Sequence, residues 1–171
     1  MIIAEGIKKL YYVESSEIKA DLTIETVKTL IESAKEITNV HQDTWSIEEA
    51  EATRTGYKNE LTGGTYRENV ELGDVSMNFT IGQYDFKTKA DLMGGDGDAT
   101  NWKRAAGIPN IKKGLIAITK DDVYVVFPKA SVSAREADTD KAIGLAVVAT
   151  ALEHDVKEVR SEYWFTESAG A

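Results

Sequence analysis

The sequence predicts an α+β fold that is mainly β, a β-sandwich or barrel with a packed flanking helix. Two features of the 171-residue chain predict it. A segment near the N-terminus repeats apolar residues at helical spacing, and many later segments alternate apolar and polar residues. Runs of strands joined by one or two helices are typical of α+β folds, because a helix packed on a sheet buries an apolar face of each.

The first helix is expected over Thr23–Ile37. Thr23 is a good N-cap, and Leu22 before it can pack against Val27 in the first turn. The apolar residues of this segment lie three and four positions apart and share one helical face, and the opposite face is charged. These apolar residues are Val27, Leu30, Ile31, Ala34 and Ile37. The pattern indicates a surface helix packed on a sheet.

The middle of the chain changes to a period of two. Val75–Ile81 is the clearest half-buried strand, since Val, Met, Phe and Ile alternate there with Ser, Asn and Thr. A longer strand with a partly polar face is expected over Trp45–Tyr57, although Glu48–Ala52 can also begin a helix. Leu61–Thr65 and Gly73-Asp74 are expected to be turns.

A second, short helix is expected over Tyr84–Met93. It ends at Gly94-Gly95, because glycine takes the left-handed conformation of a helix cap without steric cost. The polar stretch Gly94–Gly107 that follows is expected to be a loop that carries one tryptophan, Trp102.

Most of the remaining segments are expected to be strands. Leu115–Thr119 and Val123–Phe127 flank Lys120–Asp122 and predict a hairpin, and Pro128 is expected to end its second strand. Near the N-terminus, Tyr11–Val13 is either a short strand or an apolar patch. Three further strands are expected over Lys129–Ala137, Leu145–Leu152 and Val159–Thr166.

Composition limits the possible functions. The length favours one domain, residues 1–171, and the chain has no cysteine, which excludes disulfides, thiol catalysis and thiolate metal sites. It carries 29 Asp and Glu against 20 Lys and Arg, a net charge of −9. This charge disfavours a protein that coats nucleic acid, since phosphate binding needs a field of Lys and Arg. It does not exclude a surface past which nucleic acid slides.

No signal peptide or membrane partner is expected. Glu5 interrupts the apolar residues at the N-terminus, so they do not form the core of a signal peptide. The longest apolar stretch, Leu145–Leu152, is far shorter than the roughly 20 residues of a membrane-spanning helix. The sequence therefore predicts a soluble protein.

No catalytic site, metal or cofactor is expected from the residues. The two histidines, His41 and His154, lie in no recognisable catalytic context and are expected in solvated turns. The acidic stretch Gly94–Thr100 does not match a calcium loop, because the sixth and twelfth positions counted from Asp96 are Asn and Gly, where Gly and Glu are needed.

Several segments are similar to one known family. The C-terminal ones are Gly114–Ile118, Val125–Ala130 with the phrase Phe-Pro-Lys-Ala, Ala142–Leu152 with the phrase Thr-Ala-Leu, and Ser161–Phe165. In the middle of the chain they are Tyr57–Gly63 and Phe79–Gly82. Together these segments resemble the major tail tube proteins of long-tailed bacteriophages.

The resemblance implies a structural protein and no enzyme. In that family the fold is a β-sandwich or barrel with a flanking helix, six copies form a ring, and the rings stack into a tube through which DNA leaves the capsid. The tubes of contractile injection systems share this architecture. The resemblance therefore implies that the partners are further copies of the chain, other tail proteins, and DNA that passes without specific binding. It places the protein in the virion tail, made in the host bacterial cytoplasm, with no cofactor.

Two sets of residues are candidates for such an assembly. Glu49 and Glu51 lie two positions apart in the expected long strand, so both are predicted to face one side, and they are the candidates for the lumen. The glycine-rich connection Thr62–Gly73 is the candidate for reaching an adjacent subunit or ring, and an ordinary surface hairpin is the alternative. The nominated inter-subunit residues are Thr62, Gly63, Gly64, Thr65, Tyr66 and Gly73.

Two other functions remain open from the residues. One is a β-barrel ligand- or glycan-binding module of a phage tail or related injection apparatus, in which Trp45, Trp102 and Trp164 stack on sugars. The other is a hydrolase that uses the carboxylates Glu49 and Glu51, although a solvated sheet face has the same pattern.

Overall fold

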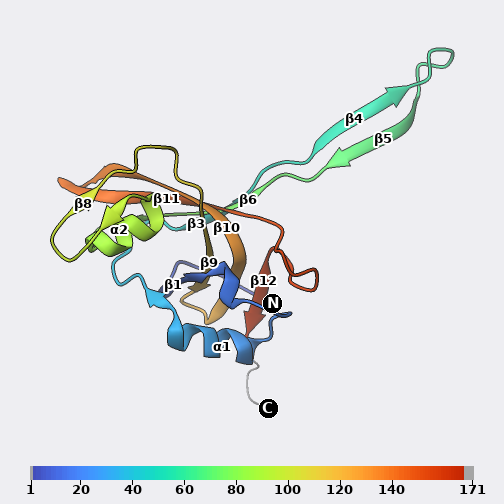
Figure 1. Ribbon diagram of the computed structural model, residues 1–171. Helices are drawn as coiled ribbons and strands as arrows, with labels where there is room; N and C mark the ends of the chain where they lie inside the picture. The colour runs from blue at the N-terminus through green and yellow to red at the C-terminus, as the bar shows by residue number, and fades with distance from the viewer. Residues whose placement is uncertain (1, 168–171) are drawn as a thin grey trace.

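The chain builds one large antiparallel sheet, from which a two-stranded hairpin projects (Figure 1). The computed structural model describes residues 2–167. The fold is α+β and mainly β, as the sequence predicts. The main-sheet strands are β1 (Lys9–Glu14), β2 (Lys35–Glu36), β3 (Ser46–Glu49), β6 (Val75–Ile81), β9 (Ile111–Ile118), β10 (Val123–Thr139), β11 (Ala142–Ala151) and β12 (Tyr163–Thr166). The other elements are η1 (Ser15–Glu17), α1 (Ile24–Ser33), β4 (Thr53–Lys58), β5 (Thr65–Glu71), α2 (Phe86–Met93), β7 (Asp96–Gly97) and β8 (Trp102–Lys103).

The strands of the main sheet follow the spatial order β2-β1-β9-β10-β11-β6-β3. Every neighbouring pair is antiparallel. The long strand β10 is shared, because β12 pairs with Val123–Val126 at its start and β11 pairs with Ala130–Thr139 at its end. Both partners lie on the side of β10 that faces away from β9.

The sheet is buried on both faces in its first half, so the fold has two hydrophobic cores. On β1, Leu10 and Tyr12 enter the first core, and Tyr11 and Val13 enter the second. Successive residues of a strand point to opposite faces, and this alternation produces the division. The first core continues under β6 and β11 with Met77, Phe79, Ile81, Leu145, Val147 and Ala149, and it includes Leu92 and Met93 of α2. The second core includes Val27 of α1, which lies along its side of the sheet (Figure 1).

Helix α1 begins where the sequence predicts and ends earlier. Thr23 is its N-cap, and the capping box is closed by Thr26, whose side chain accepts from the Thr23 backbone N–H at 2.8 Å. Leu22 and Val27 share the second core. The expected extension to Ile37 is wrong, because the backbone is already extended at Ala34 and the next residues form β2. Ile37 therefore lies in the first core, and its N–H donates to the Leu10 carbonyl at 2.8 Å.

Pro128 does not end a strand, which corrects a second expectation. Strand β10 continues through it to Thr139 over 17 residues. The register with β9 shifts between Phe127 and Ala130, and the irregularity contains the proline. A bulge leaves residues out of the ladder, so the N–H that proline lacks is not needed there. The weakly alternating segment Lys129–Ala137 is therefore the second half of the same strand.

Three other boundaries differ from the sequence-based prediction. The expected strand Trp45–Tyr57 is two strands, β3 and β4, separated by residues 50–52. The expected strand Val159–Thr166 is shorter, since only β12 is a strand. The expected loop Gly94–Gly107 contains the small pair β7–β8. The short helix α2 is confirmed and ends at Gly94, whose φ of 84° is the left-handed conformation that glycine favours. None of the described helices is long and apolar enough to cross a membrane.

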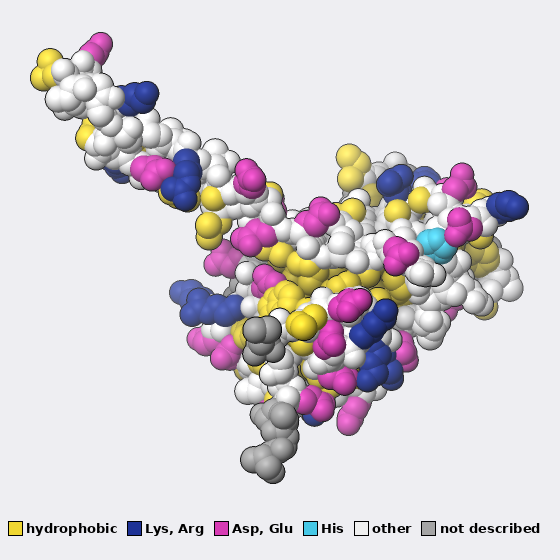
Figure 2. Space-filling view, turned by 180° about the vertical axis from the view of Figure 1, so that it is seen from behind, with side chains coloured by type: hydrophobic (Ala, Val, Ile, Leu, Met, Phe, Trp, Pro, Cys, Tyr) yellow, Lys and Arg dark blue, Asp and Glu magenta, His cyan; other side chains and the backbone are white. Residues whose placement is uncertain are grey.

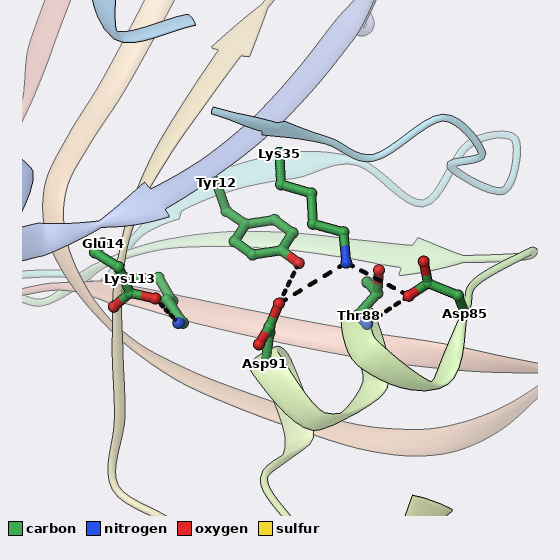
Figure 3. A network of polar contacts seen from close by, with 7 residues as sticks. All are labelled: Tyr12, Glu14, Lys35, Asp85, Thr88, Asp91 and Lys113. Carbon is green, nitrogen blue, oxygen red and sulfur yellow. Dashed lines mark hydrogen bonds and ion pairs between the residues drawn. The ribbon is translucent and has the colours of Figure 1, made fainter. Parts of the chain in front are cut away.

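Polar contacts fasten α2 to the β1–β2 edge of the sheet (Figure 3). The hydroxyl of Tyr12 in β1 donates to Asp91 Oδ2 in α2 at 2.8 Å, and burial together with this bond raises the pKa of Tyr12. Lys35 of β2 lies 3.4 Å from Asp85 Oδ1 and 3.8 Å from Asp91 Oδ2. Asp85 is the N-cap of α2 and accepts from the Thr88 N–H at 2.6 Å. That N–H bond, followed by the Thr88 hydroxyl, holds the pKa of Asp85 below its ordinary value.

Replacing Asp85 by alanine should destabilise the protein by about 1 kcal/mol at neutral pH, because the helix loses its cap. The folded pKa of Asp85 is lowered, so its contribution is fully present above the unfolded pKa of about 4 and is lost as the pH falls through the folded pKa. Urea unfolding of wild type and D85A should therefore differ at pH 7 and converge at low pH.

The matched control is Asp138→Ala, which removes an exposed carboxylate that has no hydrogen bond or ion pair within residues 2–167. This variant should unfold like wild type across the same pH range. Equal unfolding free energies for D85A and wild type at pH 7 would show that the cap contributes nothing.

Candidate assembly surface

Among residues 2–167, one face of the main sheet has no helix or strand packed over it. It spans β3, β6, β11 and the second half of β10, and we call it the open sheet face. Directly opposite residues of an antiparallel pair point to the same side. Registers place its side chains in three rows: Glu48, Ser76, Thr150, Ser131; then Ser46, Asn78, Val148, Ser133; then Thr80, Ala146, Arg135. All of these residues are exposed or half-buried.

The open sheet face is small, polar and almost uncharged. Serine, threonine, asparagine and alanine fill most positions, and the hydroxyls of Ser76 and Thr150 lie 3.1 Å apart. Val148 is its large exposed apolar residue, at 44% exposure. Its charged residues are Glu48 at one margin and Arg135 at the other. The face is therefore electrically neutral, although the chain as a whole carries a net charge of −9.

Both margins of this four-stranded region are free edges within residues 2–167. On one margin, β3 pairs with β6 and has no strand on its other side. On the other margin, β9 pairs with β10 only as far as Val132, so residues 133–139 have β11 on one side and no strand on the other. Free edges present unpaired backbone N–H and C=O groups, which are ready to pair with another strand.

Helix α2 lies beneath the β10 margin, on the side of the first core. Lys89 of α2 is nearly buried, and its ammonium is 2.6 Å from Glu136 Oε1 and 4.1 Å from the centroid of the Trp102 ring. The hydrogen bond from Lys89 lowers the pKa of Glu136. Arg104 adds a contact of 3.6 Å to the same carboxylate. These contacts hold the second half of β10 in place without covering the open sheet face.

The hairpin β4–β5, which we call the arm, projects away from the body (Figure 1). Every residue of both strands is exposed. The arm is held by its own ladder, by an ion pair of 3.1 Å between Arg54 and Glu68, and by Arg67 over the Tyr57 ring at 5.7 Å. Large apolar side chains remain in solvent, including Leu61 at the tip with 94% exposure. Figure 2 shows side chains of both charges along its length.

A close backbone contact joins the arm to the body. The Ala50 N–H donates to the Asp74 carbonyl at 2.9 Å, between the β3–β6 pair and the β4–β5 pair. A Cβ on Gly73 would lie 2.0 Å from the Ala50 carbonyl oxygen, so this position requires glycine. The joint therefore sets the direction in which the arm leaves the sheet.

The structure does not place Glu49 and Glu51 on one strand face. Strand β3 ends at Glu49, and Glu51 lies in the joint before β4 begins. Glu49 pairs with Val75, whose side chain packs on the first core, so Glu49 points to the side opposite the open sheet face. The shared face expected from the sequence is therefore wrong, because the strand is interrupted at residues 50–52. The acidic residue on the open sheet face is Glu48.

The other nominated residues lie in the arm or at its base. Thr62, Gly63 and Gly64 form its tip, and Gly63 has a φ of 70°. Thr65 and Tyr66 begin β5, so the expected glycine-rich loop is in large part a strand. Gly73 belongs to the joint. Contact of these residues with a neighbouring subunit stays a prediction.

The histidines differ from each other. His154 is buried rather than solvated, which corrects the expectation. Its Nε2 lies 3.1 Å from the Ser15 carbonyl oxygen, and its Nδ1 accepts from the Val156 N–H at 3.1 Å. His41 is half-buried and its Nε2 is 3.2 Å from Asp140. Among residues 2–167, no group of three or more His, Asp or Glu side chains is arranged to hold a metal ion.

The three tryptophans do not share one surface role. Trp45 and Trp102 are partly buried against the first core. The Trp102 indole N–H donates to the Gly94 carbonyl at 3.0 Å, and cations from Lys89 and Arg104 already lie over its ring. Trp164 is 46% exposed and donates to Glu162. Two of the three rings that the sequence offers for sugar stacking are thus engaged in packing.

No protein-family model matches this chain, and no curated protein matches it.

Sequence reasoning missed the open sheet face. The stretch Leu145–Leu152 is nearly all apolar or small, so its two faces could not be separated by hydrophobicity. The available signal was the alternation of Ser131 and Ser133 with buried Val132, which marks one polar side of β10. Pairing registers were needed to extend that side across three more strands.

Replacing Gly73 by alanine should destabilise the joint by about 1–3 kcal/mol, because the new methyl group collides with backbone that cannot move aside as a side chain can. The loss should appear as a lower midpoint in urea and as faster proteolysis near residues 50 and 73. Gly64→Ala at the tip is the matched control, since its Cβ would meet only the Thr62 hydroxyl at 3.5 Å. Wild-type behaviour of Gly73→Ala would mean that the joint is loose.

Proposed function

We propose that this chain is a structural subunit that assembles with further copies of itself. Copies join into hexameric rings, and the rings stack as a phage tail tube through which DNA is ejected. Under this proposal the protein is not an enzyme, and it works with other tail proteins and with DNA that passes without specific binding. Its place is the virion tail, after synthesis in the cytoplasm of the host bacterium. The resemblance of its C-terminal segments to major tail tube proteins supports the phage setting and the hexameric ring.

The main support for the proposal is the exposure of the arm. A two-stranded hairpin in water is marginally stable, and three or more strands or a packing partner are needed for independent stability. The arm has neither within the described chain, and it exposes apolar side chains along both strands. They are Tyr57, Leu61, Tyr66, Val70 and Leu72, with exposures from 44% to 94%. Such a segment gains its missing contacts when it lies on a neighbouring subunit.

The composition of the open sheet face suits the wall of a DNA conduit. DNA carries dense negative charge and binds clusters of Lys and Arg. A lumen wall of small hydroxyl and amide side chains, with Glu48 balanced by Arg135, offers no such cluster. It also offers no dense acidic band that repels the DNA. The proposal therefore assigns the lumen to the open sheet face, and its acidic member is Glu48 instead of Glu49 and Glu51.

Stacking and ring formation need different interfaces. A ring closes through head-to-tail contacts related by rotation, and a stack of rings stays open along its axis. The arm extends far beyond the body and so can reach a subunit that is not its nearest neighbour within the sheet (Figure 1). The proposal assigns the arm to contacts beyond the sheet edges, between adjacent subunits or adjacent rings.

Concentrated protein should form rings or tubes in negative-stain electron microscopy. A variant in which residues 51–73 are replaced by Asn-Gly should keep its thermal midpoint within a few degrees, since both strands of the arm are exposed and belong to neither core, and it should form no tubes. The short turn suits this design because Ala50 and Asp74 already pair at the base of the arm. Circular dichroism checks the fold of the variant.

Two results would contradict the proposal. One is a strictly monomeric wild-type protein at every salt and protein concentration, with no tubes when tail components are added. The other is unchanged tube formation by the folded variant without the arm, which would remove the observation on which the proposal depends.

A further inference from the structure

We infer that copies of this chain join edge to edge, with the outer edge of β3 from one copy paired to residues 133–139 of β10 from the next, and with Glu48 beside Arg135 across the junction. This inference rests on the proposed function and names the interface that closes its ring. Within one chain, β3 does not pair with β10, and the side chains of Glu48 and Arg135 do not contact each other.

The directions of the strands favour this junction. From β10 through β11 and β6 to β3, each strand is antiparallel to the one before it. The region contains an even number of strands, so β3 runs antiparallel to β10. When the β3 edge of one copy meets the β10 edge of the next, the alternation continues without a break. The same operation repeats at each junction, so it produces a closed, wholly antiparallel wall in which neither of these two edges remains unpaired.

The positions of the Glu48 and Arg135 side chains also favour this junction. The registers place Glu48 and Arg135 on the same side of the sheet, because Glu48 is in line with Ser131 and Arg135 lies four residues further along β10. Joining the two edges with the open faces continuous therefore brings both side chains to the same side of the junction. A junction with one sheet turned over would put the apolar side of one copy next to the open face of the next.

The opposite charges of Glu48 and Arg135 favour the same junction. Glu48 and Arg135 are the charged residues of the open sheet face, they have opposite sign, and each lies at a free margin. Both are exposed, and neither has a hydrogen bond or ion pair within residues 2–167. Opposite charges on neighbouring strands stabilise a pairing, whereas like charges directly opposite each other destabilise it. The pair thus favours the head-to-tail junction over β3–β3 or β10–β10 contacts, which would set like charges together.

The outer edges of β2 and β12 are the other margins of the sheet, and they are poorer candidates for the same role. Neither borders the open sheet face, because β12 pairs with the first half of β10 and β2 with β1. Strand β2, at the opposite end of the sheet, has only two residues. Its Lys35 is already engaged with Asp85 and Asp91 (Figure 3). A very short strand is one of the devices by which proteins protect an edge from pairing.

Charge reversal tests the side-chain pair. The variants E48R and R135E should each raise the protein concentration needed for ring or tube formation by roughly two- to tenfold, since each sets like charges at every junction. The double variant E48R/R135E restores opposite charges and should return close to the wild-type concentration. Lys19→Glu, an exposed position on the body between η1 and α1, is the control for a change of charge away from both margins and from the arm. Light scattering measures the concentration, and circular dichroism confirms the fold of each variant.

Disulfide formation tests the strand pairing, and the chain is well suited to it because it contains no cysteine. In assembled protein the double variant E48C/R135C should give a ladder of cross-linked species on a non-reducing gel. The variant E48C/S131C is the matched control. Ser131 lies four residues from Arg135, roughly 13 Å along the strand, which is beyond the reach of a disulfide. Each single cysteine should give at most a dimer.

The outcomes separate this inference from the proposed function. Tubes that form normally, with no cross-linked ladder from E48C/R135C and no rescue in E48R/R135E, would overturn the edge pairing and leave the tube in place. A wild-type protein that never assembles would remove both. A ladder together with rescue by the double reversal would establish the β3–β10 junction.

Discussion

The antiparallel pair β9–β10 is the constraint on which the rest of the structure depends. Alternate residues of these two strands enter different cores, so Leu115, Val125 and Phe127 lie in the first core while Ile116 and Val126 lie in the second. A pair buried on both faces needs a packing layer on each side. Helix α1 supplies part of one layer, and α2 with the bend of the sheet supplies the other (Figure 1). The positions of both helices follow from that requirement.

The bulge at Pro128 gives the two halves of β10 different roles. Before it, the strand lies between β9 and β12 and is buried on both faces. After it, even-numbered residues such as Val132 pack on the first core, while Ser131, Ser133 and Arg135 face solvent. The pairing with β9 also stops soon after the bulge, and this leaves an edge without a partner. One local irregularity thus separates the part of the strand that is paired on both sides from the part whose edge has no partner strand among residues 2–167.

The net charge of −9 has a particular distribution. The arm, residues 53–71, carries three basic and three acidic side chains, and the open sheet face carries one of each. The excess acidity therefore lies on the rest of the body. Neutral surfaces approach one another without long-range repulsion, whereas like-charged acidic surfaces repel one another. This distribution is what the proposed assembly requires, since its contacts are assigned to the arm and to the margins of the open sheet face.

Local patterns by themselves determined much of this fold. The period-two alternation of Val75–Ile81, the cap at Thr23 and the glycines after Met93 predicted β6 and both helices, since each depends on neighbours within a few residues. Only the tertiary structure decided that Ile37 belongs to the opposite core, that β10 passes through Pro128, and that Glu48 and not Glu49 shares a face with Arg135. These outcomes depend on strand registers and on packing between residues far apart in the chain. A shift of one residue in register exchanges the two faces of a strand, and hydrophobic pattern alone does not specify register where both faces are small or polar.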